Sequence, residues 1–157
     1  MLTDELKSNP IVTALEAALP GALRGGKFDR QEWTFEIASE TIVPVCAFLK
    51  TEQRFIRLST VTAVDWYPEE PRFEVVYHVN SLERNESLRL KCRLPGTDPE
   101  IDSVTLVWRG ANWYERETFD LFGIRFRNHP DLRRIMLPED WVGHPLRKDY
   151  PVTGDRV

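Results

Sequence analysis

Two neighbouring segments in which apolar and polar side chains alternate constrain the fold of this chain most strongly. Residues 72–81 read RFEVVYHVNS and residues 86–95 read ESLRLKCRLP, and in each segment every second side chain is apolar. A period of two is the pattern of a half-buried β-strand, and the intervening LERNE is typical of a hairpin loop. The pattern therefore predicts antiparallel strands with one face packed on helices and the other facing solvent or a partner.

The flanking segments predict two further strands and two short helices. Strands are predicted from Phe55 to Trp66 and over EWTFEIAS, residues 32–39. A helix is predicted from Ile11 to Leu19, because apolar residues recur there every four positions and Pro20-Gly21 would stop it. A second helix is predicted from Thr41 to Lys50, with Pro44 tolerated in its first turn.

A longer helix is predicted to end at residue 123. Its apolar positions run from Val104 to Leu121 at helical spacing, and either Asp98-Pro99 or Asp102-Ser103 would begin it. Gly123 is well placed to end the helix in a left-handed conformation. Gly110 would lie inside the helix, at a cost of up to about 1 kcal/mol relative to alanine.

Regular patterning stops at residue 125. Residues 125–157 contain four prolines and no helix or strand period, yet they are rich in apolar side chains. A disordered tail would not be so apolar, so this segment is expected to lie against its own domain or another protein, and composition leaves both open. The predicted fold class is α+β: a small two-layer domain over residues 1–124, with helices and a mostly antiparallel or mixed sheet, followed by an extended irregular C-terminal interface segment over residues 125–157.

Charge and cysteine usage exclude several functions. The net charge is −4, and residues 101–157 hold nine basic and nine acidic residues, so the positive excess that nucleic-acid binding needs is missing. Cys46 and Cys92 cannot complete a zinc or iron–sulfur site alone. The N-terminus does not resemble a secretory or transit signal, and no apolar run approaches the ~20 residues that span a bilayer. Any membrane association is expected to go through a partner.

The stretch ERETFDLFGIRFRNHPDLRRIMLP, residues 115–138, raises the question of catalysis. On a helix, Glu115 and Glu117 project about 200° apart and cannot share one substrate. Arg116 and Asp120 are four residues apart and are predicted to pair with each other. No nucleophile elbow, HExxH motif or phosphate-cradling loop is present. A salt-bridged helix face is therefore favoured, and a hydrolase that uses His129 or His144 with Asp120 is the rival.

Metal binding and a protein interface are the other two interpretations of the same stretch. His129 and His144 are each followed by proline, but no helix or hairpin spacing brings them together, so the metal signal is weak. Arginines interleaved with aromatic residues are typical of buried protein contacts. These arginines would anchor the segment to a partner or would remain solvated while it wraps its own domain.

A long ordered motif gives this region a family resemblance. The stretch WYERETFDLFGIRFRNHPDLRRIMLPEDWVGHPLRKDYP strongly resembles the signature of the C subunit, or 30-kilodalton subunit, of the proton-pumping NADH:quinone oxidoreductase (complex I). Upstream, TAVDWYPEEPRFEVVYHVNS is similar to the same family. The residues that fit the signature, and that the resemblance implies as interface positions, are Glu115, Arg116, Glu117, Asp120, Phe122, Gly123, His129, Arg133, Arg134, Trp141, His144, Arg147, Lys148, Asp149 and Tyr150.

The resemblance implies a subunit that supports electron transfer from NADH to quinone without a catalytic, metal or cofactor site of its own. FMN and the iron–sulfur clusters would belong to partner subunits. The implied partners are the D (49-kilodalton) subunit, along which the C-terminal segment would lie, and neighbouring iron–sulfur subunits. The implied location is the cytoplasmic face of the bacterial inner membrane, with only indirect membrane contact. The alternative is the equivalent subunit of a membrane-bound hydrogenase or ferredoxin-linked complex.

One expectation about side-chain partners follows from this interpretation. Arg133, Arg134 and Arg147 are expected to pair with carboxylates of a partner, or internally with Glu115, Glu117 and Asp120.

Overall fold

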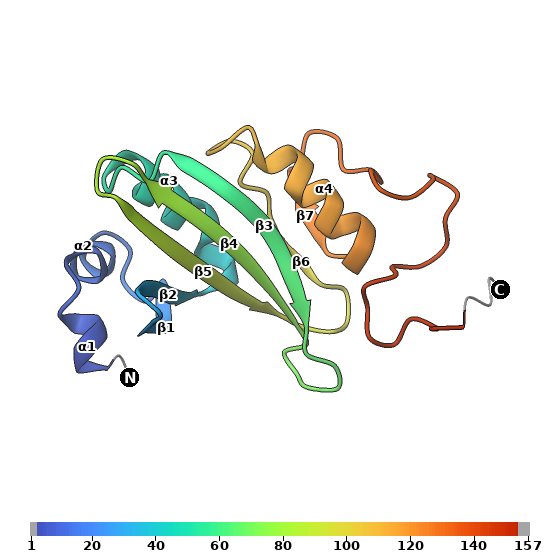
Figure 1. The fold of residues 1–157 in the computed structure, drawn as a ribbon, viewed down its shortest axis with the longest axis horizontal. Coiled ribbons are helices and arrows are strands. Elements are labelled where there is room, and N and C mark those ends of the chain that lie inside the picture. The colour runs from blue at the N-terminus through green and yellow to red at the C-terminus, as the bar shows by residue number, and fades with distance from the viewer. Residues whose placement is uncertain (1–2, 154–157) are drawn as a thin grey trace.

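A five-stranded sheet forms the centre of the computed structural model, which describes residues 3–153. Its strands are β1 (Leu23–Asp29), β2 (Glu32–Ile37), β3 (Arg57–Asp65), β4 (Phe73–Ser81) and β5 (Glu86–Leu94). They lie in the order β1-β2-β5-β4-β3 (Figure 1). The β2–β5 pair is parallel and the other pairs are antiparallel. The sheet is therefore mixed and mostly antiparallel, which confirms the predicted α+β class.

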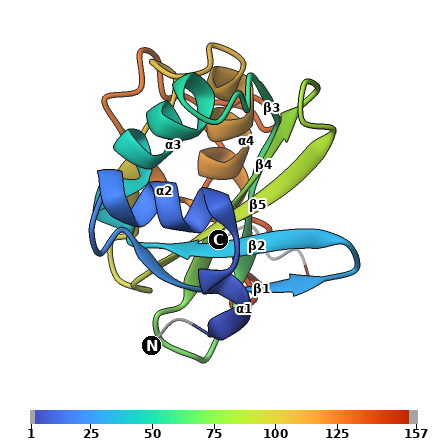
Figure 2. The same cartoon turned by 90° about the vertical axis from the view of Figure 1, so that its left-hand side faces the viewer.

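Helices cover one side of this sheet. They are α1 (Asp4–Lys7), α2 (Pro10–Ala18), α3 (Ile42–Thr51), which follows the 3-10 turn η1 (Ser39–Thr41), and α4 (Ala111–Phe122). Figure 2 shows α3 and α4 on the same side of β3–β5. Within residues 3–153, no helix is long and apolar enough to cross a membrane.

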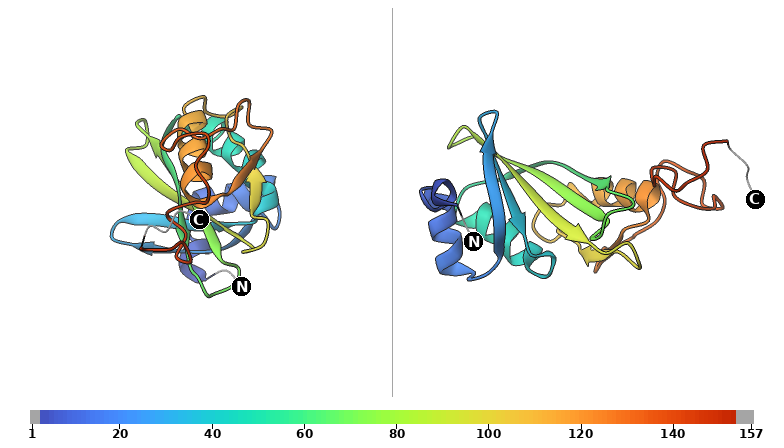
Figure 3. Two further views of the ribbon diagram at one scale, coloured as in Figure 1. Left: turned by 90° about the vertical axis from the view of Figure 1, so that its right-hand side faces the viewer. Right: turned by 90° about the horizontal axis from the view of Figure 1, so that it is seen from below.

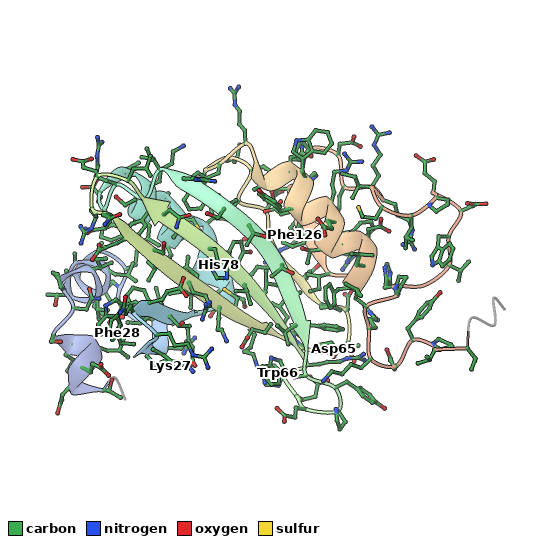
Figure 4. The ribbon with its side chains drawn as sticks, viewed as in Figure 1. Lys27, Phe28, Asp65, Trp66, His78 and Phe126 are labelled. Carbon is green, nitrogen blue, oxygen red and sulfur yellow. The ribbon has the colours of Figure 1, made fainter. Side chains whose placement is uncertain are left out.

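The alternating strands divide the sheet into an apolar and a charged face. Phe35, Phe73 and Tyr77 are fully buried beneath the helices. The opposite face carries cross-strand ion pairs such as Lys91–Glu74, with a 3.0 Å Nζ–Oε1 distance. His78 lies on this charged face, 3.6 Å from Glu32 (Figure 4). The period of two thus places the core on one face only.

Strand β1, at the N-terminal side of the sheet, was not predicted from the sequence. Residues 23–29 form β1, which no pattern indicated, because its sequence LRGGKFD has no alternation and contains two glycines. The hairpin to β2 turns at Arg30 and Gln31, both with positive φ. The predicted helices 11–19 and 41–50 are found as α2 and α3 with ends shifted by about one residue.

The start of the long helix was predicted wrongly. Residues 100–102 are a strand, β6 (Glu100–Asp102), which pairs in parallel with β7 (Arg125–Arg127), and α4 begins only at Ala111. Gly110 is therefore the N-cap of α4 and not an interior residue. Val104 and Trp108 are four residues apart, as on one face of a helix, but both are buried in the turns that precede α4.

The chain after β7 has no helix or strand up to residue 153. It runs past the C-terminal end of α4 and ends at the opposite side of the molecule from α1 and α2 (Figures 1 and 3). The predicted boundary between residues 124 and 125 stays a prediction, although β7 continues regular structure to Arg127.

Gly123 turns the chain from α4 into this segment, as predicted. Its φ of 74° is left-handed, and its N–H donates to the Phe119 carbonyl at 2.8 Å. A Cβ here would lie 2.6 Å from His144 Cδ2 and 2.7 Å from Arg147 Nη2. Residues 144–147 therefore pack directly against a position that tolerates only glycine.

Gly123→Ala is expected to lower the free energy of unfolding by about 1–3 kcal/mol, because alanine is strained at positive φ and would push His144 and Arg147 away. The matched control is Gly110→Ala, whose Cβ would meet no heavy atom within 4 Å and which should change stability by less than about 0.5 kcal/mol. Thermal melting of the two variants measures the difference. Equal melting temperatures would contradict the packing of residues 144–147 on Gly123.

Candidate functional site

We define the C-terminal segment as residues 128–153. The buried carboxylate of Asp120, on α4, binds the first part of this segment. Asp120 is 0% exposed, and its Oδ2 accepts hydrogen bonds from the backbone N–H groups of Ile135, Met136 and Leu137 at 3.1, 2.7 and 2.9 Å. Its Oδ1 lies 2.7 Å from Arg134 Nη1. Burial raises the pKa of Asp120, but these donors outweigh burial and hold that pKa below its usual value.

Two arginines extend this attachment to the backbone. Arg134 also donates to the carbonyls of Asp120 and Gly143, at 3.1 and 2.9 Å. Arg116 donates to the carbonyls of Arg133 and Arg134, both at 3.1 Å. The predicted Arg116–Asp120 pair is therefore wrong, because the C-terminal segment gives each of these side chains a different partner. The predicted internal pairing of Arg134 with Asp120 is found.

The last turn of α4 binds the next part of the segment. Helix C-termini leave carbonyls without an intrahelical partner. Here Asp120 O accepts from His144 Nδ1 at 2.9 Å, Leu121 O from the Leu146 N–H at 3.0 Å, and Phe122 O from Arg147 Nε at 2.6 Å. Because these carbonyls form the negative end of the helix dipole, the cationic Arg147 is favourable beside them.

A second buried carboxylate holds the distal part of the segment. Asp65, at the end of β3, makes two 2.8 Å hydrogen bonds with Arg72 and accepts the Lys148 N–H at 2.8 Å. Arg72 also pairs with Asp149 Oδ1 at 2.8 Å. Burial raises the pKa of Asp65, but Arg72 and the backbone N–H groups of Lys148 and Tyr67 hold that pKa well below its usual value. Figure 4 shows Asp65 on the side of the sheet that faces the segment.

Asp65 and Arg72 were not identified as functional from the sequence. They are seven residues apart across the β3–β4 loop, so no helix or strand spacing relates them. The only signal is that both fall in the stretch TAVDWYPEEPRFEVV that carries part of the family resemblance.

The remaining signature residues occupy different environments. Phe122 is buried in the core, whereas Glu117 is exposed on α4. Among residues 3–153, Arg133 pairs only with the exposed Asp131, at 2.9 Å, so its predicted pairing with a helix carboxylate is not found there. The Trp141 N–H closes a turn on the Pro138 carbonyl at 3.0 Å. Tyr150 packs on Gly143, where a Cβ would lie 2.8 Å from the Tyr150 ring.

Glu115 and His129 form a separate buried cluster. Glu115 accepts hydrogen bonds from Ser103 Oγ at 2.6 Å and the Val104 N–H at 2.8 Å. Burial raises its pKa to about 7 despite these two donors. His129 Nε2 lies 3.9 Å from the carboxylate and 3.2 Å from the Asn112 carbonyl, and its Nδ1 accepts from the Asp131 N–H. The cluster joins α4 to the turns that follow β6 and β7.

This geometry favours a structural role over catalysis. Both ring nitrogens of His129 are engaged in backbone hydrogen bonds, and Asp120 is occupied by four donors. Within the described residues, no group of three or more His, Cys, Asp or Glu side chains could hold a metal ion.

The apolar side chains of the segment are directed outward while its backbone is bound. Met136 is 65% exposed and Val142 77% exposed. Ile135 and Leu146 are also exposed, although the N–H groups of both donate to α4. On α4, the exposed Trp113 lies against Arg116, with the guanidinium carbon 5.2 Å from the ring centroid. We call these exposed residues the apolar face, and the side chains of residues 3–153 leave each of them exposed.

Glu115→Gln is expected to change how stability depends on pH. The folded pKa of about 7 lies above the usual 4.5, so the wild type gains stability from protonated Glu115 below pH 4.5 and loses it as pH rises through 7. The loss is about 3 kcal/mol at 1.36 kcal/mol per pKa unit. The difference in unfolding free energy between variant and wild type, from urea titrations at pH 4.5 to 8, should move in favour of the glutamine variant as pH rises. A pH-independent difference would contradict a buried, titrating Glu115.

Comparison with known proteins places this fold in one family. A family model described as respiratory-chain NADH dehydrogenase, 30 Kd subunit, matches residues 35–156. The C subunit of NADH-quinone oxidoreductase from Geobacter sulfurreducens is 46% identical over 149 residues, covering 94% of this chain and 92% of the relative. The protein of the same name from Roseiflexus castenholzii is 47% identical over 152 residues, covering 95% and 87%.

Two solved structures share the architecture. The trypsin-resistant fragment (1-134) of Nqo5 superposes with a TM-score of 0.66 at 29% identity, covering 76% of this chain and 97% of the fragment. A chain of the membrane-bound sulfane sulfur reductase, an archaeal respiratory membrane complex, superposes with a TM-score of 0.70 at 26% identity, covering 93% and 86%. With the extent of the family match, these similarities show that the chain belongs to the family of the 30-kilodalton subunit of respiratory-chain NADH dehydrogenase, also named the C subunit of NADH-quinone oxidoreductase.

Proposed function

We propose that this chain is a non-catalytic peripheral subunit of a proton-translocating NADH:quinone oxidoreductase and docks on the D subunit through its C-terminal segment. The supporting observation is the uncovered apolar face of that segment. Its Met136, Val142 and Leu146 are exposed on a backbone that α4 and β3 hold through hydrogen bonds. Large apolar patches on a protein surface often mark sites of protein–protein interaction.

The way the segment is attached suits a docking surface. An irregular chain carries unpaired N–H and C=O groups, and burying them without a partner costs free energy. Here Asp120, Arg116 and Arg134 satisfy several of these groups from inside the domain. A partner therefore needs to cover mainly apolar side chains, which are the groups that contribute most at interface centres.

The side chains that could bind a redox group are unsuited to it. Thiolates are the ligands of iron–sulfur clusters. Cys46 and Cys92 are both fully buried, and burial raises the pKa of each thiol well above its usual value. This supports the expectation that the iron–sulfur clusters belong to partner subunits, and FMN is expected there from the family resemblance. The membrane association of this chain would then be indirect, at the cytoplasmic face in bacteria.

Arg134→Ala is expected to weaken incorporation of the full chain into the complex and to reduce quinone reductase activity. It leaves the buried Asp120 carboxylate without its cationic partner, and truncating one member of a buried charge pair typically costs about 2–5 kcal/mol. Arg24→Ala is the matched control, because Arg24 is 64% exposed, pairs with the exposed Glu40 and lies outside the C-terminal segment. The amount of this chain in the purified complex and the NADH:quinone activity of that complex measure both effects.

Three results would count against the proposal. Normal assembly and activity of the Arg134 variant would contradict the role of the segment in docking. Turnover by the isolated chain, abolished by changing His144, would favour the hydrolase. Co-purification from the native membrane with a nickel–iron hydrogenase, in place of a flavin-bearing NADH-oxidising subunit, would favour the related complex.

A further inference from the structure

Several charged side chains of the C-terminal segment are paired within the chain. Arg134 pairs with Asp120, Asp149 with Arg72, and Arg133 with Asp131. Glu139 and Asp140 differ, since no ion pair or hydrogen bond connects either carboxylate to another residue among 3–153. Both are exposed. Two adjacent carboxylates therefore remain unpaired in a segment whose other acidic residues each have a cationic partner.

These two carboxylates lie next to two exposed residues of the apolar face. They occupy the turn that the Trp141 N–H closes on the Pro138 carbonyl at 3.0 Å. Met136 precedes the turn and Val142 follows it, and both are largely exposed. A partner that covers both side chains must also cover or border the turn between them.

Covering the turn has an electrostatic consequence. Moving a carboxylate from water into a protein contact costs several kcal/mol unless an opposite charge or hydrogen-bond donors compensate. For two adjacent carboxylates the cost is larger, because each also repels the other as the local dielectric constant falls. Among residues 3–153, no cation pairs with either carboxylate, so a partner that covers the turn has to supply the compensating charge or donors.

We propose that the partner surface that receives this segment is an apolar groove with lysine or arginine side chains opposite Glu139 and Asp140. The proposal rests on the docking function above and adds the charge and chemistry of the receiving face. Charges at an interface rim act mainly on the association rate and on orientation. The acidic turn therefore steers the segment into the groove and fixes its direction along it.

The test measures how fast the full chain joins a complex prepared from a strain that lacks this subunit. The wild-type association rate should fall as salt rises, because salt screens attraction between rim charges. Glu139→Lys with Asp140→Lys should slow association on the order of 10-fold at low salt. The difference should shrink toward none at high salt. Circular dichroism and thermal melting show that the exposed substitutions leave the fold intact.

A matched control separates local from global charge. Glu5→Lys with Asp29→Lys makes the same change in net charge at exposed positions near the other end of the molecule, and should associate like the wild type. Equal slowing by both double variants would mean that only net charge matters, and would overturn the proposal.

A third variant separates this inference from the docking function. Met136→Ser with Val142→Ser removes apolar contact and leaves the charges, so it should lower the amount of stable complex at every salt concentration. If it does so while the lysine variant associates like the wild type at low and high salt, docking stands and the basic groove is overturned. If it also assembles like the wild type, docking through this segment is wrong.

Discussion

The path of the C-terminal segment along the domain depends on one buried carboxylate. Asp120 stands in the last turn of α4, where no basic residue of the helix offsets it and where the negative end of the helix dipole opposes another negative charge. Three consecutive backbone N–H groups and Arg134 reverse that disadvantage. Because all four donors come from residues 134–137, a charge that is unfavourable in the helix alone fixes where the chain goes after it.

As a consequence, this segment buries several charged side chains and exposes several apolar ones. In a folded domain, charged side chains normally face water and apolar ones face the core. In residues 128–153, Arg134 and Arg147 bind a carboxylate and a carbonyl of α4 and Asp149 binds Arg72. In contrast, Met136 and Val142 are largely exposed. The chain belongs to a family of respiratory-complex subunits, and the docking proposed above would cover the apolar side chains that the segment exposes.

Elements that are determined by a few adjacent residues could be predicted from the sequence, and elements that depend on distant contacts could not. Strands β4 and β5 and the left-handed Gly123 could be predicted, because side-chain alternation and the need for glycine at positive φ are properties of a few adjacent residues. Strand β1 was missed because its glycines carry no pattern and its pairing with β2 is what makes it a strand. The start of α4 was misplaced because burial of Val104 and Trp108 in turns repeated the helical spacing by coincidence.

The sequence by itself determined the α+β class, the sheet face that is buried, and an apolar, arginine-rich C-terminal segment that must lie against something. It could not decide what each charge binds. Arg116 and Asp120 are four residues apart and were predicted to pair with each other, yet both bind residues 14–18 positions away. Asp65 accepts the Lys148 N–H, which lies 83 residues further along the chain. Only the tertiary structure settles such choices, because a buried ion takes the set of donors or acceptors that best replaces its lost water, and that set is assembled by chain segments distant in sequence.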